Sequence, residues 1–200
     1  MKAETRLRFF SSEDQKWATP KRIFNRFDAV FRFKLDPCCV PKTAKCATYF
    51  TPETDGLKQD WHKVGNTFVN PPFSRELPLW IKKSFDESQK GIIVAMLIPA
   101  RPDTQAWQTY CLPYAKILFI KGRITFEDQR DKPMEKLNPA FFPSALVVFG
   151  NTKDWQLENL EDLGVWLIKL SEVKVADGTP TTNDGIPPNN KLSGILPNEL

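Results

Sequence analysis

The sequence predicts an α/β fold in which helices flank a mostly parallel central sheet. The run "IIVAMLIPA" at 92–100 is continuously apolar, as is typical of a strand buried on both faces of such a sheet. Helix-like and strand-like segments alternate from residue 77 to residue 150, which favours parallel strands joined by helices. With 41% hydrophobic residues in a chain of 200, the protein can bury a substantial core.

The first element along the chain is expected to be a helix that begins near residue 20. Thr19 can cap this helix, and Pro20 suits its first turn. Apolar residues then recur with helical spacing and form one face, at Ile23, Phe24, Phe27 and Val30 or Phe31. This face predicts that the helix packs against the sheet.

Three strands are expected next, at 31–36, 46–50 and 66–70. The first ends at an Asp-Pro pair and the third at a Pro-Pro pair, and neither strand can continue through its proline. Ligands of parallel sheets bind beyond the carboxyl ends of the strands. Asp36 and Asn70 stand at two such ends, so we expect them on one rim.

The second half of the chain predicts a regular succession of elements. Each is bounded by Gly or Pro or by a change of periodicity. They are a helix at 77–91, a strand at 92–100, a helix at 102–114, a strand at 116–127 with a bend at Gly122, a strand at 144–150 and a helix–strand pair within 158–170. The segment 128–143 between two of these strands is polar and predicts a loop.

Composition predicts one domain over residues 1–173, with a polar N-terminal extension at 1–15. Residues 174–200 are rich in Pro, Gly, Asn and Thr and predict a flexible tail. The chain shows no signal-peptide pattern and no apolar run of membrane-spanning length, so we expect a cytoplasmic protein without a membrane partner. The net charge of +4 is compatible with a nucleic-acid partner but does not require one.

The four cysteines do not form a recognisable framework. Cys38, Cys39, Cys46 and Cys111 are irregularly spaced, which favours a reducing compartment over secretion. A zinc site could combine the first three with His62. The paired C-x2-C spacing of such sites is missing, so the sequence favours a protein without a metal.

The segment "FVNPPFS" at 68–74 predicts a rigid clamp for an exocyclic amine. A nucleophilic amine nitrogen needs acceptors that hold both of its hydrogens away from the ring plane. Asn70 offers a side-chain carbonyl, and Pro71 offers a backbone carbonyl without a competing N–H. Pro71 and Pro72 fix φ, which holds the acceptors with little loss of entropy. Phe73 offers a flat face for stacking.

This motif is part of a wider resemblance. "NPPF" resembles the (Asp/Asn/Ser)-Pro-Pro-(Tyr/Phe/Trp) motif of S-adenosylmethionine-dependent amino-methyltransferases. Most of residues 15–150 is similar to the phage-type DNA N6-adenine methyltransferases. The matching segments are "WATPKRIF" at 17–24, "FRFKLDPCC" at 31–39, "DGLKQDW" at 55–61, "FVNPPFS" at 68–74, "VAMLIPARPDTQAW" at 94–107 and "KGRITFE" at 121–127.

The resemblance implies a Rossmann-like methyltransferase fold and a site-specific reaction on double-stranded DNA. A methyl group would pass from S-adenosylmethionine to N6 of a flipped-out adenine. Asn70 and Pro71 would accept the hydrogens of the amine, Pro72 would shape the turn and Phe73 would stack on the base. We call these four residues the amine clamp.

The resemblance also implies a cofactor site. Asp36, followed by Pro37, stands where the family places an acidic residue near the methionine end of S-adenosylmethionine. The N-terminal border of this pocket corresponds to Trp17, Thr19 and Pro20, and either Asp55 or Asp60 would meet the ribose or adenine. One departure is clear, because the turn "DPCCVPKTA" lacks the glycines that commonly approach the cofactor.

Several alternatives remain open from the sequence. Arg101 and Arg123 follow strand ends and could contact DNA phosphates or simply be solvated. Phe73 could be a core residue and Asp36 a turn former. An RNA adenine or protein glutamine methyltransferase would use the same amine clamp, and a non-catalytic DNA-binding or cofactor-binding module could retain the same sheet. A phage-encoded enzyme would act in the cytoplasm of the bacterial host.

Overall fold

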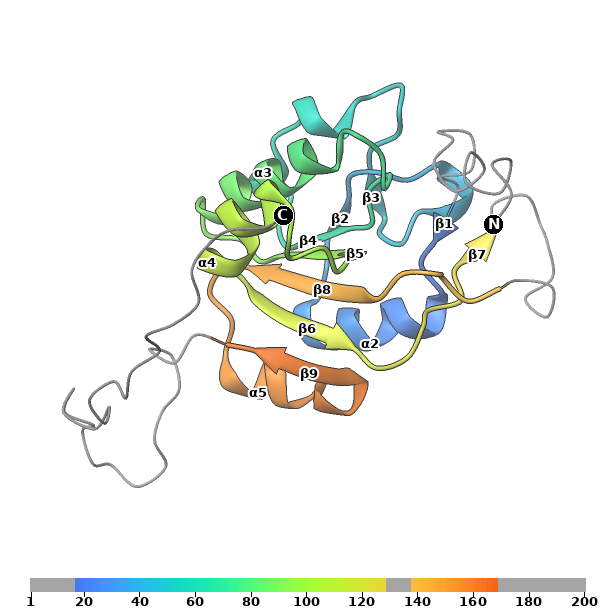
Figure 1. The fold of residues 1–200 in the computed structure, drawn as a ribbon. Helices are drawn as coiled ribbons and strands as arrows, with labels where there is room; N and C mark the ends of the chain where they lie inside the picture. Colours follow the sequence, from blue (N-terminus) through green and yellow to red (C-terminus); the bar gives the residue numbers. More distant parts are fainter. Residues whose placement is uncertain (1–16, 129–137, 169–200) are drawn as a thin grey trace, which may run out of the picture. The chain divides into compact units, whose positions relative to one another are not determined.

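A computed structural model of the chain describes residues 17–128 and 138–168 (Figure 1). All of them lie within residues 1–168, the first of two units into which the chain divides. The expected extension at 1–15, the tail at 174–200 and most of the expected 128–143 loop fall outside the described residues. Within the described ranges, no helix has both the length and the apolar character needed to cross a bilayer.

The described residues form a seven-stranded sheet with two layers of helices around it. In spatial order its strands are β3 (Thr48–Tyr49), β2 (Leu35–Asp36), β4 (Thr67–Val69), β5 (Val94–Pro99), β8 (Ser144–Phe149), β6 (Lys116–Ile120) and β9 (Gly164–Leu167). The first four are mutually parallel, whereas β8 is antiparallel to both of its neighbours and β9 is antiparallel to β6. The predicted α/β class with a parallel centre is therefore confirmed.

The direction of β6 follows from these pairings. Because β8 runs against both β5 and β6, those two strands point the same way. Five strands thus place their carboxyl ends at one edge of the sheet, which we call the carboxyl edge. Figure 1 shows β8 between β5 and β6, with its arrow reversed.

Helices cover both faces of the sheet, and the side chains of β5 point alternately into the two hydrophobic clusters that these helices form with the sheet. Val94, Met96 and Ile98 belong to one cluster, together with side chains of α3 (Leu77–Ser88). Ala95 and Leu97 belong to the other, together with α2 (Lys21–Phe31). All six residues of β5 are buried, which confirms the prediction from the continuous apolar run. Figure 1 shows α2 and α3 on opposite sides of the sheet.

One prediction about the first helix and one about the strand after it are wrong. Thr19 does not cap α2, because Pro20 occupies the cap position and no side chain makes a capping hydrogen bond. The helix also continues through Phe31, so the expected strand at 31–36 shrinks to Leu35–Asp36. Phe31 extends the buried face of the helix, and Arg32 ends it in a left-handed conformation with φ of 53°.

Other boundaries differ from expectation in the described residues. The strand expected at 116–127 ends at Ile120, and Gly122, with φ of 79°, turns the chain toward β7 (Glu127–Asp128). β7 pairs with β1 (Trp17–Ala18) in a separate two-stranded sheet. The strand expected at 46–50 is reduced to β3.

The remaining helices are short. The helix expected at 102–114 contains a π-helical segment, η5 (Trp107–Cys111), followed by α4 (Leu112–Tyr114). The last helix, α5 (Asp154–Glu158), begins before the range expected for it, and η7 (Glu161–Leu163) leads from it into β9. Three further 3₁₀ turns lie between β2 and β4, at η2 (Pro41–Thr43), η3 (Gly56–Lys58) and η4 (Trp61–Lys63).

Candidate active site

A pocket opens at the carboxyl edge between β1, β2 and β4. Its lining residues come from four separate segments of the chain. They are Ala18, Thr19, Asp36, Cys38, Cys39, Thr43, Lys45, Phe68, Asn70 and Pro72. Asp36 ends β2 and Asn70 directly follows β4, and these two strands are paired through Leu35 and Thr67. The structure therefore brings Asp36 and Asn70 to one rim, as their positions in the sequence predict.

Asp36 is a buried carboxylate held by backbone donors. Its side chain accepts hydrogen bonds from the N–H of Lys45 at 3.0 Å and from the N–H of Cys38 at 3.5 Å, and the residue is 4% exposed. Burial raises the pKa of Asp36 to about 6, although the two N–H groups oppose that shift. At neutral pH the side chain is thus mainly ionised, and it is suited to binding a cationic group.

The loop after β2 contains no glycine and packs closely against a glycine of η3. A Cβ on Gly56 would stand 1.9 Å from the carbonyl oxygen of Pro37, so only glycine permits this close approach. The loop is also fixed by hydrogen bonds between the backbones of Cys39 and Phe50 and of Phe50 and Asp36. Gly56 of η3 thus packs directly against this loop, although it is not among the residues that line the pocket.

Thr19 brings a buried hydroxyl to the pocket. The residue is 1% exposed, and its Oγ1 has no hydrogen-bond partner among the described residues. A buried hydroxyl without a partner costs about 1–3 kcal/mol, which a ligand that bonds to it would recover. Pro20 is buried at the start of α2 and does not line the pocket, and the backbone of Trp17 pairs with that of Asp128.

The amine clamp is only partly at the pocket. Asn70 and Pro72 line it, whereas Pro71 is buried beside them. Phe73 is half-buried and packs edge-to-face against Phe126, at 6.1 Å between ring centroids, and against Phe142, at 5.4 Å. Its neighbours thus include core rings, and its role in stacking stays a prediction.

The structure does not bring the other two predicted aspartates to the pocket. Asp55 accepts a hydrogen bond from the N–H of Leu57 at the start of η3 and pairs with Lys58 at 2.9 Å. Asp60 pairs with Lys63 at 2.6 Å. Both carboxylates have local structural partners, and their roles toward a cofactor stay predictions.

Arg101 and Arg123 lie at the carboxyl edge but outside the pocket lining. They follow β5 and β6, whose carboxyl ends share this edge. Arg123 is exposed and Arg101 is partly exposed, and neither makes an ion pair within the described part of the chain. A DNA contact by either residue stays a prediction.

Lys45 is a pocket residue that the sequence interpretation missed. Its side chain is 13% exposed, and its Nζ lies 3.5 Å from Oε2 of Glu127. Glu127 also accepts a hydrogen bond from the backbone N–H of Lys21, at the start of α2. The available signal was the pair of lysines, Lys42 and Lys45, in the loop "DPCCVPKTAK", because that loop follows a strand at the carboxyl edge. Thr43 in the same loop was missed as well.

The cysteines do not form the zinc site considered above. All four are free thiols. Their sulfur atoms and the ring nitrogens of His62 do not come together as a group of three potential metal ligands within the described residues. Burial raises the pKa of Cys38 and Cys39 well above the usual range and that of Cys46 to about 12. His62 is engaged elsewhere, with Glu87.

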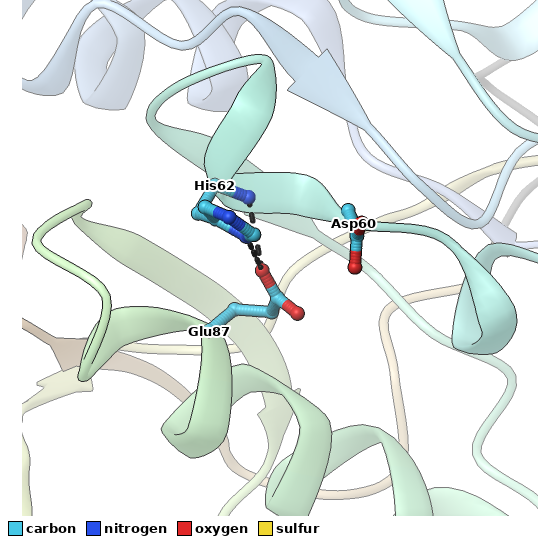
Figure 2. Close-up of side chains that lie close together, drawn as sticks. All are labelled: Asp60, His62 and Glu87. Atoms are coloured by element: carbon cyan, nitrogen blue, oxygen red, sulfur yellow. Dashed lines mark hydrogen bonds and ion pairs between the residues drawn. The ribbon is translucent and has the colours of Figure 1, made fainter.

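Among the described residues, only Asp60, His62 and Glu87 bring three potential metal-binding side chains together (Figure 2). Glu87 is fully buried and accepts hydrogen bonds from Lys83 and Lys90, both at 2.8 Å, and from the backbone N–H of His62 at 2.9 Å. Burial alone would raise the pKa of Glu87, but these bonds outweigh it and lower the pKa to about 2. Two ammonium groups already neutralise this carboxylate, so the cluster is an ion network that joins η4 to α3.

Comparisons with known proteins give one family model and two relatives that match this chain. Residues 8–161 match the family model of the DNA N-6-adenine-methyltransferases (Dam). The chain is 28% identical over 111 residues to a DNA N-6-adenine-methyltransferase of Escherichia phage T1, covering 54% of this chain and 46% of that relative. It is 38% identical over 64 residues to the putative methyltransferase YfdM of Escherichia coli K12, covering 29% of this chain and 70% of YfdM.

The match to the phage protein thus spans about half of that relative's length. The family model, by contrast, spans well over half of this sequence and includes the pocket and the amine clamp. The chain therefore belongs to the DNA N-6-adenine-methyltransferase (Dam) family.

Proposed function

We propose that this protein transfers a methyl group from S-adenosylmethionine to N6 of adenine in double-stranded DNA. One observation carries the proposal. Asp36 and Asn70, from neighbouring parallel strands, line the same pocket. Methyl transfer needs a cofactor site and an amine site in direct contact, because the amine attacks the methyl carbon in line with the bond that breaks.

The residues of the pocket fit the methionine end of S-adenosylmethionine. Asp36 offers a buried negative charge to the cofactor's ammonium group, and Thr19 offers a hydroxyl without a partner among the described residues. Cys38 and Cys39 are small and uncharged, so they leave room beside these groups. The cofactor, when bound, supplies an electrophilic methyl group on its sulfonium. Support for a Rossmann-like fold comes from the parallel strands β2, β4 and β5 with helices on both faces.

The amine clamp would orient the adenine. The side-chain carbonyl of Asn70 and the backbone carbonyl of Pro71 accept the two hydrogens of the N6 amine, which directs the nitrogen lone pair toward the methyl group. Phe73 stacks on the base. A base inside a duplex cannot reach this pocket, so the adenine leaves the helix at a cost of a few kcal/mol. Arg101 and Arg123, at the same edge, would contact the backbone phosphates.

A methyl-transfer assay tests this function. Purified protein is incubated with S-adenosylmethionine carrying a labelled methyl group and with duplex DNA, structured RNA or a cellular protein extract in parallel. We expect label in DNA alone, recovered as N6-methyladenine, and sequencing of DNA from overexpressing bacteria should show it in one sequence context. Label in RNA or in protein glutamine would establish one of the alternative methyltransferases instead.

A second measurement separates the enzyme from a binding module. Calorimetry should detect S-adenosylmethionine binding to the protein without DNA. Binding of the cofactor or of DNA without any methylated product would contradict catalysis.

A further inference from the structure

The pocket holds one cation besides its one buried carboxylate. Lys45 is the basic side chain among the residues that line the pocket in the described part of the chain. The same residue donates its backbone N–H to Asp36, so the position of its backbone is tied to that carboxylate. The Lys45 charge also counteracts the rise in the pKa of Asp36. An anion-binding group and a cation-binding group thus stand side by side.

This pair of charges matches the methionine end of the proposed cofactor. An α-amino acid carries its ammonium and its carboxylate on the same carbon, so a site that recognises it needs a negative and a positive group in one small pocket. Asp36 meets only the first requirement. A carboxylate placed in the pocket without a donor would face the negative charge of Asp36 in a poorly hydrated site, which is costly.

We propose that Lys45 binds the α-carboxylate of S-adenosylmethionine, while Asp36 binds its ammonium group. The inference rests on the proposed function and assigns a further binding residue to the same pocket. An ammonium group has three donors, and among the described residues Lys45 Nζ contacts Glu127 at 3.5 Å. That distance is at the long limit for a charge-assisted bond, so Lys45 retains donors for a ligand.

Glu127 serves this arrangement as a positioning residue. It accepts from the backbone N–H of Lys21 and faces Lys45 from β7, so it holds the lysine between the start of α2 and the pocket. Glu127 is not itself among the residues that line the pocket. It therefore provides a control that separates the charge of Lys45 from the ion pair that Lys45 makes.

Calorimetry with two ligands tests the proposal without relying on activity. S-adenosylmethionine and its decarboxylated analogue differ only in the carboxylate. We expect the wild type to bind S-adenosylmethionine roughly tenfold to a hundredfold more tightly than the analogue, as for the loss of one charged hydrogen bond. Lys45→Met should abolish this preference by lowering the affinity for S-adenosylmethionine but not for the analogue. Lys45→Arg should keep most of the preference.

The controls are Lys42→Met and Glu127→Gln. Lys42 is exposed three residues earlier and does not line the pocket, so its variant should keep the wild-type preference. Glu127→Gln should also keep it, because the lysine charge remains. Thermal melts of each variant establish that it is folded, and Lys45→Gln replaces Lys45→Met if that variant does not fold.

Two results would overturn the assignment. An unchanged preference in Lys45→Met would remove Lys45 from the carboxylate site, and an equal loss for both ligands would show that Lys45 only shapes the pocket. A wild type that binds neither ligand would refute the proposed function itself. That outcome is distinct from tight cofactor binding with a ligand preference that the Lys45 substitution does not change.

Discussion

Asp36 shows at the scale of one residue how a binding site opposes stability. Its carboxylate is desolvated in the folded protein, which raises its pKa to about 6, whereas an unfolded chain leaves it near 3.9. The folded state therefore binds the extra proton between these values. The contribution of Asp36 to stability is complete below about pH 4 and declines as the pH rises through 6. At neutral pH the folded protein thus keeps the Asp36 carboxylate ionised, although burial disfavours the charged form.

A comparison of the wild type with Asp36→Ala tests this linkage. The unfolding free energy of the wild type relative to the variant should fall by up to about 3 kcal/mol between pH 4 and pH 7, from a shift of about two pKa units. Urea unfolding of both proteins at several pH values measures it. The affinity of the wild type for S-adenosylmethionine should instead rise with pH over this range. It should weaken below about pH 6, where Asp36 is protonated. A stability difference that is independent of pH would contradict the shifted pKa.

Asn70 is the residue whose loss should affect chemistry most selectively. Asn70→Ala removes one acceptor of the amine, and loss of one such preorganised contact typically lowers the rate by ~10²–10³. Because Asn70 lines the pocket and is only partly buried, the melting temperature and the cofactor affinity should change little. Single-turnover methyl transfer and calorimetry with S-adenosylmethionine measure the two effects. Turnover near the wild-type rate would remove Asn70 from the mechanism.

At the scale of elements, Phe73 joins three segments that are far apart in the sequence. Its ring meets Phe126, which precedes β7, and Phe142, which precedes β8. The residue thus contributes to the fold as well as to the proposed stacking of the base. These two roles make different predictions for matched substitutions.

Phe73→Ala should lower both stability and activity. Two aromatic pairs are lost, each worth about 0.5–1.5 kcal/mol, and so is base stacking worth ~1–3 kcal/mol. Phe142→Ala is the matched control, because it removes one of the same ring pairs but leaves the stacking residue in place. Both variants should melt below the wild type, yet only Phe73→Ala should raise the KM for DNA, and Phe73→Tyr should keep activity. Equal KM values for the two alanine variants would assign Phe73 to the core alone.

The sequence predicts elements better than it predicts their boundaries or their neighbours. β5 was predictable because its apolar run is continuous, and α3 because its apolar residues recur with helical spacing. The strand expected at 31–36 was wrong because Phe31 satisfies the helical and the strand pattern equally, and its burial beside Phe27 decides for the helix. The position of β8 between β5 and β6 depends on pairing across distant segments, which no local pattern records.

The same distinction applies to the site. Asp36 and Asn70 directly follow strands, so the rule for parallel sheets places both of them. Lys45 reaches the pocket only through the path of a loop that is fixed by Gly56 and Phe50. Asp55 and Asp60 lie in a similar connection, but the turns η3 and η4 engage them with neighbouring lysines. The pocket residue on a loop could therefore be located only from the structure, whereas the pocket residues at strand ends could be predicted from the sequence.

At the scale of the whole molecule, the carboxyl edge combines the pocket with two arginines. Five strands of the seven-stranded sheet end at this edge, and Arg101 and Arg123 follow two of them. Lys153 lies beyond the end of the reversed strand β8, at the opposite edge. The modest net charge of +4 therefore matters less than where the positive side chains stand.

Salt dependence of DNA binding tests this placement. Each phosphate contact adds about 0.9 to the slope of the logarithm of the binding constant against the logarithm of salt concentration. Arg101→Ala and Arg123→Ala should each weaken duplex binding to a similar extent for all sequences and reduce the magnitude of the slope by about 1. Lys153→Ala, which removes an exposed charge at the opposite edge, should leave the slope unchanged. Fluorescence anisotropy over a series of salt concentrations measures all four proteins, and calorimetry should show unchanged cofactor binding. If the Lys153 variant lost as much slope as the arginine variants, DNA would be bound by the overall charge of the protein rather than by the carboxyl edge.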